Sequence, residues 1–362
     1  MKVLHLSSEK TWRGGEQQIA YLMDELRDTH QVETLAAARA NSEFAKRMYQ
    51  KKHRVVELPF KSELDLYTAY KVKELVNDEK IDIVHMHSGH SHTIGVLSKV
   101  LGHDAKLVLS KRTDYPVKDN FFSRWKFNHP AIKRILCVSG KIKEVLKPDI
   151  KDFEKVEVVY SGIDMKKFEI ENPQNVRDIL SLPKDAKIVV NTSAISEQKD
   201  IGTFIEVAEK VLPQHPNTYF VLCGDGPLKE EMEKRVQDKK LDRFIFMGFR
   251  KDLPDFLSSA DIFLITSQDE GLGTAILDAF ANKLPVIATR AGGIPEIVRH
   301  NETGLTAEVK DVETLSQEVS SLLSNPESAT GLIENAYKLA EEFSYKRTAS
   351  QTLQIYKSIL EN

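Results

Sequence analysis

The chain has 362 residues, of which 41% are hydrophobic and 29% are charged, and its formal net charge is −3. This length favours two compact domains, and the composition excludes a disordered, collagen-like or coiled-coil protein. The apolar runs are far shorter than the roughly 20 residues that a membrane-spanning helix needs.

The N-terminal segment MKVLHLSSEKTW has too short an apolar stretch for a secretory signal, so we interpret it as a first strand. The two cysteines, Cys137 and Cys223, lie in separate strand-like runs more than 80 residues apart. This spacing argues against a disulfide framework and is typical of a reducing compartment. We therefore expect a cytoplasmic protein.

Strand-like runs alternate with stretches of helical periodicity through the first half of the chain. The strand-like runs are KVLHL, IDIVH, KLVLS and RILCVS. The alternation resumes near Lys187 with KIVVNTS, TYFVLCG, FIFMG, DIFLITS and PVIAT. Each series predicts a parallel sheet with helices outside it.

A polar segment punctuated by Gly162, Pro173 and Pro183 separates the two series and indicates an interdomain connection. We expect an N-terminal Rossmann-like domain at 1–168, a C-terminal one at 169–344, and a final helix at 345–362. That helix has two arrangements open to it, on the N-terminal or on the C-terminal domain. Ligands of doubly wound sheets bind beyond the carboxyl ends of the strands, so we expect a site in a central cleft that both domains face.

Charge is divided unevenly: residues 1–168 hold 30 Lys and Arg against 23 Asp and Glu, and the remainder holds 21 against 31. Residues 111–147 contain ten basic and three acidic side chains. The basic residues include Lys118, Arg124 and Lys126, and the aromatic residues Phe121, Phe122, Trp125 and Phe127 are interleaved with them. One interpretation is a solvated helix face with core aromatics. The other is a surface for an anionic acceptor or for anionic lipid headgroups. No recognition motif suggests nucleic acid.

Glu270 follows the strand DIFLITS and precedes a glycine-rich turn and a helical pattern. A strand, such a turn and a helix start form an anion site, because free N–H groups and the helix dipole attract a diphosphate. Glu270 needs a different partner there, such as sugar hydroxyls. Asp278 lies about 80° around the following helix from Glu270. Its carboxylate could accept two hydrogen bonds from vicinal hydroxyls of a ribose.

The segment SQDEGLGTAILDAFANKLPVIATRAGGIPEIVRHNETG resembles the signature of the retaining glycosyltransferases of family 4, which have the GT-B fold of two Rossmann-like domains. Other landmarks follow in family order: GGEQQ at 14–18, IDIVHMH at 81–87, VVYSGIDMKKF at 158–168, SEQKD around Lys199, CGDGPLKEEM at 223–232 and FMGFRKDLPDFLSSADIF at 246–263. The resemblance extends over nearly the whole chain.

The resemblance implies transfer of a sugar from a nucleoside-diphosphate sugar to a hydroxyl of a glycan, a glycolipid or a small molecule. A UDP-sugar is favoured over GDP- and ADP-sugars, and the expected setting is cell-envelope polysaccharide or glycoconjugate synthesis. A location on the inner face of the plasma membrane is then an alternative to the free cytoplasm. Retention implies front-face displacement, in which a donor phosphate oxygen takes the acceptor proton. No metal or cofactor is implied.

Donor-site roles follow from the same resemblance. Lys199 neutralises the diphosphate and Glu270 contacts the donor sugar. Gly14 and Gly15 let backbone amides approach the phosphates, and Asp278 holds the ribose. Gly226 and Phe249 border the base. The sugar and phosphate cradle is completed by the backbone amides of Gly271, Leu272, Gly273 and Thr274.

Three positions depart from the family pattern. The second acid of the Glu-x7-Glu pair is Asp278, the arginine five residues before Lys199 is replaced by Ala194, and Arg112 occupies the place of a histidine. An arginine is a bidentate phosphate ligand. We hypothesise that Arg112 supplies the charge that Ala194 lacks; a surface or acceptor role is the alternative.

The run HMHSGHSH places His85, His87, His90 and His92 after one strand. Clustered histidines suggest a metal site, but no cysteine or carboxylate joins them. We therefore prefer an acceptor-side loop in which His87 faces the cleft. Arg13 and Glu16, which flank the glycine pair, are further acceptor-side candidates, although Glu16 also suits a helix start.

Three other functions compete with a transferase. An oxidoreductase is disfavoured because SSEKTWRGGEQQ after the first strand lacks the G-x-G-x-x-G fingerprint. A catalytically inactive nucleotide-sugar-binding relative fits the three departures. A sugar-nucleotide epimerase of the same fold is the remaining alternative.

Overall fold

The computed structural model describes residues 1–361 apart from 172, 174 and 251. Its chain divides into two compact units, one made of residues 1–162 and 345–362 and the other of residues 163–344. The boundary falls before Ile163 and not after residue 168, because Ile163 donates a backbone hydrogen bond to Phe343 and the turn at Met165–Phe168 packs on helices of the second unit.

Unit 1 is built on a parallel sheet of seven strands in the order β3-β2-β1-β4-β5-β6-β7. The strands are β1 (Lys2–Ser7), β2 (Glu33–Arg39), β3 (Arg54–Leu58), β4 (Ile83–Met86), β5 (Lys106–Lys111), β6 (Ile132–Cys137) and β7 (Val156–Val158). Its helices are α1 (Gly14–Asp28), α2 (Glu43–Gln50), α3 (Leu66–Asp78), α4 (Gly89–Val100), α5 (Phe121–Phe127), α6 (Gly140–Leu146), α14 (Tyr345–Glu361) and the 3₁₀ turn η1 (Phe153–Lys155).

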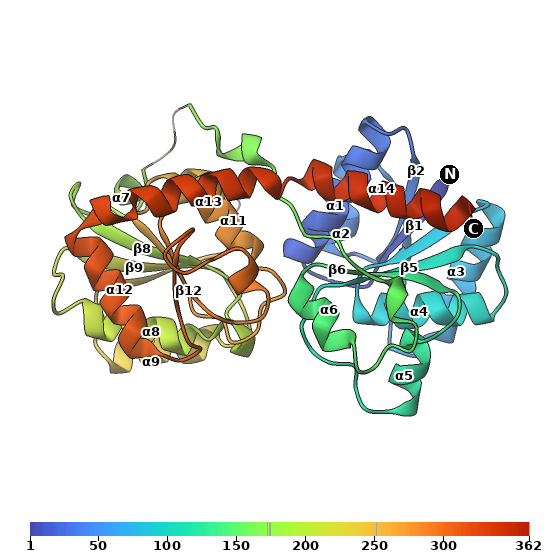
Figure 1. Cartoon of the computed structure of the whole chain (residues 1–362), viewed down its shortest axis with the longest axis horizontal. Coiled ribbons are helices and arrows are strands. Elements are labelled where there is room, and N and C mark those ends of the chain that lie inside the picture. The colour runs from blue at the N-terminus through green and yellow to red at the C-terminus, as the bar shows by residue number, and fades with distance from the viewer. Residues whose placement is uncertain (172, 174, 251, 362) are drawn as a thin grey trace. The chain divides into compact units, whose positions relative to one another are not determined.

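The C-terminal helix α14 lies alongside α1 (Figure 1). Its apolar side shares a core with the sheet and α1, formed by buried residues that include Val3, Leu22, Leu26, Leu353 and Ile359. Burial of these side chains removes apolar area from water, which is the main force that holds the helix there. Of the two arrangements open to this helix, the structure has the one on the N-terminal domain.

Unit 2 has a parallel six-stranded sheet in the order β10-β9-β8-β11-β12-β13. The strands are β8 (Lys187–Thr192), β9 (Thr218–Cys223), β10 (Phe244–Gly248), β11 (Ile262–Ile265), β12 (Val286–Thr289) and β13 (Leu305–Ala307). The helices are α7 (Val176–Ile179), α8 (Ile201–Val211), α9 (Lys229–Asp238), α10 (Leu253–Ser258), α11 (Thr274–Ala281), α12 (Val312–Ser324) and α13 (Thr330–Glu342), with 3₁₀ turns η2 (Met165–Phe168), η3 (Glu197–Lys199), η4 (Ile294–Glu296) and η5 (Pro326–Ala329).

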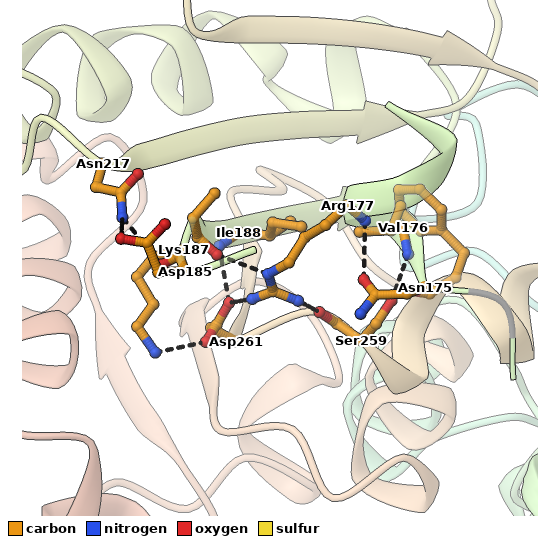
Figure 2. Close-up of polar contacts among 11 residues, drawn as sticks. Asn175, Val176, Arg177, Asp185, Lys187, Ile188, Asn217, Ser259 and Asp261 are labelled. Carbon is orange, nitrogen blue, oxygen red and sulfur yellow. Dashed lines mark hydrogen bonds and ion pairs between the residues drawn. The ribbon is translucent and has the colours of Figure 1, made fainter. Parts of the chain in front are cut away.

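A polar cluster ties α7 to the start of this sheet (Figure 2). Arg177 donates to the carboxylate of Asp261 at 2.5 Å, and it also donates to the backbone oxygens of Ala186 and Ser259. Asp261 accepts further bonds from Lys187 Nζ at 3.0 Å and from the backbone N of Ile188 at 2.9 Å. The carboxylate of Asp261 and the guanidinium of Arg177 therefore fix α7 against the first residues of β8 and the segment before β11.

Candidate functional site

The order of strands in unit 2 reverses between β8 and β11, which are neighbours in the sheet. In doubly wound sheets, ligands bind beyond the carboxyl ends of the strands at this switch point. Lys199 and Glu270 lie in the two connections that leave β8 and β11. The topology thus carries both residues to the position where this architecture holds its ligand.

The side chains of Lys199 and Glu270 meet. Lys199 Nζ donates to Glu270 Oε2, and the two groups form an ion pair with only 22% and 13% of their side chains exposed. The hydroxyl of Ser267 donates to the same carboxylate oxygen at 3.4 Å. The backbone oxygen of Glu270 accepts from Gly293 N at 2.9 Å. Glu270 is therefore held by both its side chain and its backbone.

The loops that carry this pair are joined to each other. Thr266 Oγ1 donates to the backbone oxygen of Asp200 at 2.9 Å, and Gln268 N donates to that of Gln198 at 2.7 Å. These bonds link the segment after β11 to the turn η3 that ends at Lys199. The separation of Lys199 from Glu270 is consequently set by backbone contacts and does not depend on the ion pair alone.

The turn between Glu270 and α11 requires glycine at one position. Gly273 has φ +92°, and a Cβ there would lie 2.9 Å from Ile276 Cδ1. Because Gly273 caps α11 without a side-chain oxygen, the amides of Thr274 and Ala275 stay available to an anion, whereas Ile276 N already donates to Gly273 O at 2.9 Å. Leu272 is buried and Gly271 is half-buried.

Asp278 lies one turn inside α11 and is half-buried. Its carboxylate has no hydrogen-bond partner among the residues that the structure describes. Burial raises the pKa of Asp278 to about 7, and the positive charge of Lys167 acts in the opposite direction. A carboxylate without a partner is suited to accept hydrogen bonds from ligand hydroxyls.

Gly226 brings the connection after β9 against the connection after β8. A Cβ at Gly226 would lie 2.3 Å from Ile195 O, so only glycine allows this approach. Ile195 N donates to Asp225 O at 3.1 Å in the same contact. Phe249 follows the end of β10 and is 58% exposed, which leaves one aromatic ring open to solvent.

In unit 1 the strand order reverses between β1 and β4. Gly14 and Gly15 begin α1 just beyond β1, and Arg13 is the residue that caps this helix. Glu16 is buried and accepts from Arg13 N at 3.0 Å. Burial raises the pKa of Glu16, although the hydrogen bond from Arg13 and the charge of Arg112 lower it. Glu16 thus has the helix-start role that the sequence left open.

Arg112 lies beyond β5 with its side chain beside Gly15 and His87. Its Cδ is 3.7 Å from the position of a Cβ on Gly15, and its Nη2 donates to His87 Nδ1 at a long 3.5 Å. No carboxylate of the described residues forms an ion pair with it, and its Nε is buried without a partner. Burial lowers the pKa of Arg112 to about 10, with Glu16 opposing the shift. Arg112 is therefore a cation that forms no ion pair with the described residues, although the charge of Glu16 acts on it, and such a cation suits an anionic ligand.

The histidine run divides between two environments. His85 and His87 converge with His5 of β1, and one ring nitrogen of each lies within 4.8 Å of the others. His90 is exposed, and His92 bonds the backbone oxygen of Lys126 at 3.2 Å. Three imidazoles are a ligand set that metals accept. However, the positive charge of Arg112 beside His87 opposes a cation, and each of the three rings already has a hydrogen bond within the protein.

The basic aromatic segment is only partly a surface. Lys126 is buried, and its Nζ donates to Glu63 Oε1 and to Thr93 Oγ1, each at 3.0 Å. The prediction of Lys126 as a surface cation is wrong, because this lysine joins α5 to α4 and to the loop before α3. Phe121, in contrast, is 86% exposed and Lys118 is exposed.

Three residues of unit 1 that the motifs did not indicate contact the histidines beside Arg112; this group of residues is called the histidine cluster. His5 hydrogen-bonds His87, and Ser110 and Tyr356 each bond His85. His5 is a histidine set among the apolar residues of the strand KVLHL, which is the one signal in the sequence that could have indicated it. Tyr356 is 271 positions from His85, and nothing local to either residue reveals their contact.

No helix of the described residues has both the length and the apolar character that a bilayer span requires.

Family models match most of the chain. The model described as glycosyl transferases group 1 matches residues 173–339, and the model of glycosyltransferase family 4 matches residues 12–167. The chain is 26% identical to the N-acetyl-alpha-D-glucosaminyl L-malate synthase of Bacillus anthracis, over 82% of this chain and 80% of that enzyme. It is also 26% identical to the UDP-Gal:alpha-D-GlcNAc-diphosphoundecaprenol alpha-1,3-galactosyltransferase of Escherichia coli, over 69% and 68%.

Solved structures share the fold. HepE of Anabaena, in complex with UDP and glucose, superposes with a TM-score of 0.86 at 19% identity, over 99% of this chain and 100% of that one. A glycosyltransferase of Rickettsia africae gives 0.87 at 22% identity, over 100% and 99%. These likenesses confirm the expected GT-B type of fold, two Rossmann-like domains with parallel sheets.

Proposed function

The chain belongs to the glycosyltransferases of group 1 and family 4, and we propose that it transfers a sugar from a nucleoside-diphosphate sugar to an acceptor hydroxyl with retention of configuration. The Lys199–Glu270 pair at the β8/β11 switch point is the observation that carries this proposal. It puts a cation for the diphosphate and an acceptor for sugar hydroxyls at the start of α11, where backbone amides add to the anion site.

The donor in this proposal is a UDP-sugar. HepE of Anabaena was solved with UDP-glucose, and the name of the Escherichia coli relative specifies UDP-galactose. The uridine ribose would be held by Asp278, whose carboxylate has no hydrogen-bond partner among the described residues, and the base would lie toward Gly226 and Phe249. GDP- and ADP-sugars are the competing donors.

The charge that develops on the leaving diphosphate would be stabilised by Lys199 and by Arg112. Arg112 has no carboxylate partner among the described residues, and the backbone beside it, at Gly14 and Gly15, carries no side chain that would block a phosphate. Fixed charges aimed at developing charge are the largest single contribution in many enzymes. A donor phosphate oxygen takes the acceptor proton in this mechanism, so it requires neither a protein nucleophile nor a metal.

The acceptor would bind on the side of Arg13, Glu16 and His87. The names of the relatives range from an N-acetyl-alpha-D-glucosaminyl L-malate synthase to a transferase that acts on a diphosphoundecaprenol-linked sugar. We therefore propose a glycan, glycolipid or small-molecule acceptor, in envelope polysaccharide or glycoconjugate synthesis. For a lipid-linked acceptor, exposed Phe121 and Lys118 would touch the anionic inner face of the plasma membrane.

The proposal is tested with a thermal-shift panel of UDP-, GDP- and ADP-sugars. A ligand at 100 times its dissociation constant adds about 2.7 kcal/mol to the free energy of unfolding, which gives a measurable rise in melting temperature. We expect the rise with a UDP-sugar, and nucleotide release only when acceptor and donor are both present. Absence of a shift with every donor contradicts the proposal. Donor binding without acceptor-dependent release identifies an inactive binder, and isomerisation of the free donor sugar identifies an epimerase.

A further inference from the structure

Tyr356 lies in α14, at the C-terminal end of the sequence, and contacts His85 in the histidine cluster of unit 1. The side chain is fully buried, and its hydroxyl lies 2.5 Å from His85 Nδ1. The other nitrogen of this ring, His85 Nε2, lies 2.8 Å from Ser110 Oγ. The rings of Tyr356 and His85 meet edge to face, with centroids 5.7 Å apart. His85 is thus fixed at both nitrogens.

Hydrogen-bond accounting assigns the tautomer of His85. Burial raises the pKa of Tyr356 well above 10, so its phenol keeps its proton. His85 Nδ1 is the one acceptor that the described residues offer to that proton. An unpaired donor in a buried place costs about 1–3 kcal/mol. The phenol therefore donates to Nδ1, and the ring proton of His85 lies on Nε2, where it is donated to Ser110.

Arg112 assigns the other two rings. A guanidinium can only donate, so His87 Nδ1 has to accept from Arg112 Nη2 and the proton of His87 lies on Nε2. That proton is donated to His5 Nδ1 at 3.0 Å. His5 then carries its proton on Nε2, an atom that is buried without a partner among the described residues. All three rings are neutral, and burial lowers the pKa of each of them, that of His5 to about 3.

The imidazole rings connect two hydrogen-bonded series of side chains. One series runs from Tyr356 through His85 to Ser110, and the other runs from Arg112 through His87 to His5. The centroids of His85 and His87 are 3.9 Å apart with an interplanar angle of 37°, and His5 stacks on His87 at 5.3 Å. We propose that Tyr356 is a positioning residue, because it fixes the tautomer and orientation of His85, and His85 supports His87. His87 presents an unprotonated Nδ1 to Arg112 and so holds the guanidinium in place. The contribution of Arg112 to catalysis rests on the proposed function, whereas the tautomers do not.

The test is ¹⁵N NMR of histidine side chains in the full chain, with His85 and His87 assigned from His85→Gln and His87→Gln. We expect each of these rings in the wild type at neutral pH to be one neutral tautomer protonated at Nε2. Tyr356→Phe should give His85 a mixture of tautomers. Leu353→Ala removes a buried apolar side chain from the same helix and should leave the tautomers unchanged even as it lowers the melting temperature.

A wild-type His85 protonated at Nδ1 overturns the proposal, and this spectrum decides the matter even if Tyr356→Phe does not fold. Equal tautomer populations in the wild type and in Tyr356→Phe also overturn it. In turnover assays with a UDP-sugar, Tyr356→Phe should raise the donor KM at least threefold, whereas Leu353→Ala should not; equal KM values contradict the link to Arg112. A wild type that accepts no nucleotide sugar contradicts the proposed function and leaves the tautomer result standing.

Discussion

Lys199 and Glu270 neutralise each other across the carboxyl ends of β8 and β11. The cation proposed for a diphosphate and the carboxylate proposed for a sugar are thus partners in one ion pair. We expect a bound donor to exchange this ion pair for two sets of contacts, Lys199 with phosphate oxygens and Glu270 with hydroxyls. Because a half-buried ion pair has to be separated, the gain from donor binding is smaller than its contacts alone suggest.

Lys199→Ala should lower kcat about 100- to 1000-fold, the usual cost of removing one group that stabilises transition-state charge. The measurement is the initial rate of nucleotide release at saturating donor and acceptor. Lys210→Ala, which removes a lysine from an exposed ion pair with Glu313, is the matched control and should keep the wild-type rate. A loss of less than threefold in Lys199→Ala would show that Lys199 does not carry this charge.

Arg112→Ala should weaken donor binding and turnover together if, as hypothesised, Arg112 supplies the positive charge that Ala194 lacks. Arg112→Lys should restore activity only in part, since an ammonium lacks the planar fork that binds phosphate in a bidentate manner. Donor Kd from calorimetry and kcat/KM from initial rates measure the two effects. The hypothesis is wrong if Arg112→Ala turns over like the wild type while Lys199→Ala is inactive.

Asp278 should make donor binding depend on pH, because its pKa of about 7 lies far above the ordinary value of 3.8. Affinity for a UDP-sugar should rise between pH 6 and 8 as the carboxylate forms and becomes a stronger acceptor. Asp278→Asn should remove this dependence. A UDP-sugar is used and not UDP, whose terminal phosphate itself titrates near pH 6, as phosphate monoesters do. Identical pH profiles for the two proteins would rule out this role.

The raised pKa of Asp278 should also make the free energy of unfolding depend on pH. Between about pH 4 and 7 the folded protein keeps a proton on Asp278 that the unfolded chain has released, so on this account the free energy of unfolding falls as pH rises through that range. In Asp278→Asn this part of the fall should be absent. Melting curves of both proteins from pH 5 to 8 measure it alongside the binding data.

Asp261→Ala should destabilise unit 2 by about 2–3 kcal/mol, because Arg177 keeps its charge in a half-buried place and loses its carboxylate. Urea unfolding followed by circular dichroism measures the change. Glu206→Ala breaks the more exposed pair with Arg235 and should cost no more than about 1 kcal/mol. Equal costs for the two substitutions would show that the cluster of Figure 2 is no stronger than a surface ion pair.

The double variant Phe121→Ser and Lys118→Ser should reduce flotation with anionic vesicles about fivefold or more, since it removes an exposed apolar anchor and a cation. The control is Tyr49→Ser with Lys52→Ser, another exposed aromatic–lysine combination on unit 1. Neutral vesicles should bind the wild type poorly. Equal flotation of the two double variants contradicts the membrane proposal. Lys126 is unsuitable for this test because it is buried and its Nζ bonds Glu63 and Thr93, so its loss would disturb the packing around α5.

The sequence was informative where function depends on local pattern. Glu270 was indicated by its place between a strand and a glycine-rich turn, and Lys199 by the family resemblance of the segment around it. Parallel strands bring such connections to one edge of a sheet. It was uninformative where two distant side chains share a space. The burial of Lys126 depends on Glu63 and Thr93, which lie 63 and 33 positions away, and a cation beside aromatics looks the same in a sequence whether it is paired or solvated.

The short strand Leu305–Ala307 at the edge of the second sheet was also missed, because three residues carry almost no periodicity. The contact of Tyr356 with His85 could not be predicted for a different reason. An amphipathic helix shows in its sequence that one face is buried, but it does not show which domain buries that face.

The return of α14 to unit 1 determines the order in which the protein can be finished during synthesis. Residues 163–344 are translated between the two segments of unit 1, so the domain that begins first on the ribosome is completed last. Until Ala349, Leu353 and Ile359 emerge, the apolar side of α1 at Leu22 and Leu26 stays open to water and to other chains. A nascent chain at this stage is a natural client for chaperones, and an isolated N-terminal domain made in the laboratory has to carry residues 345–362 as a fusion to be whole.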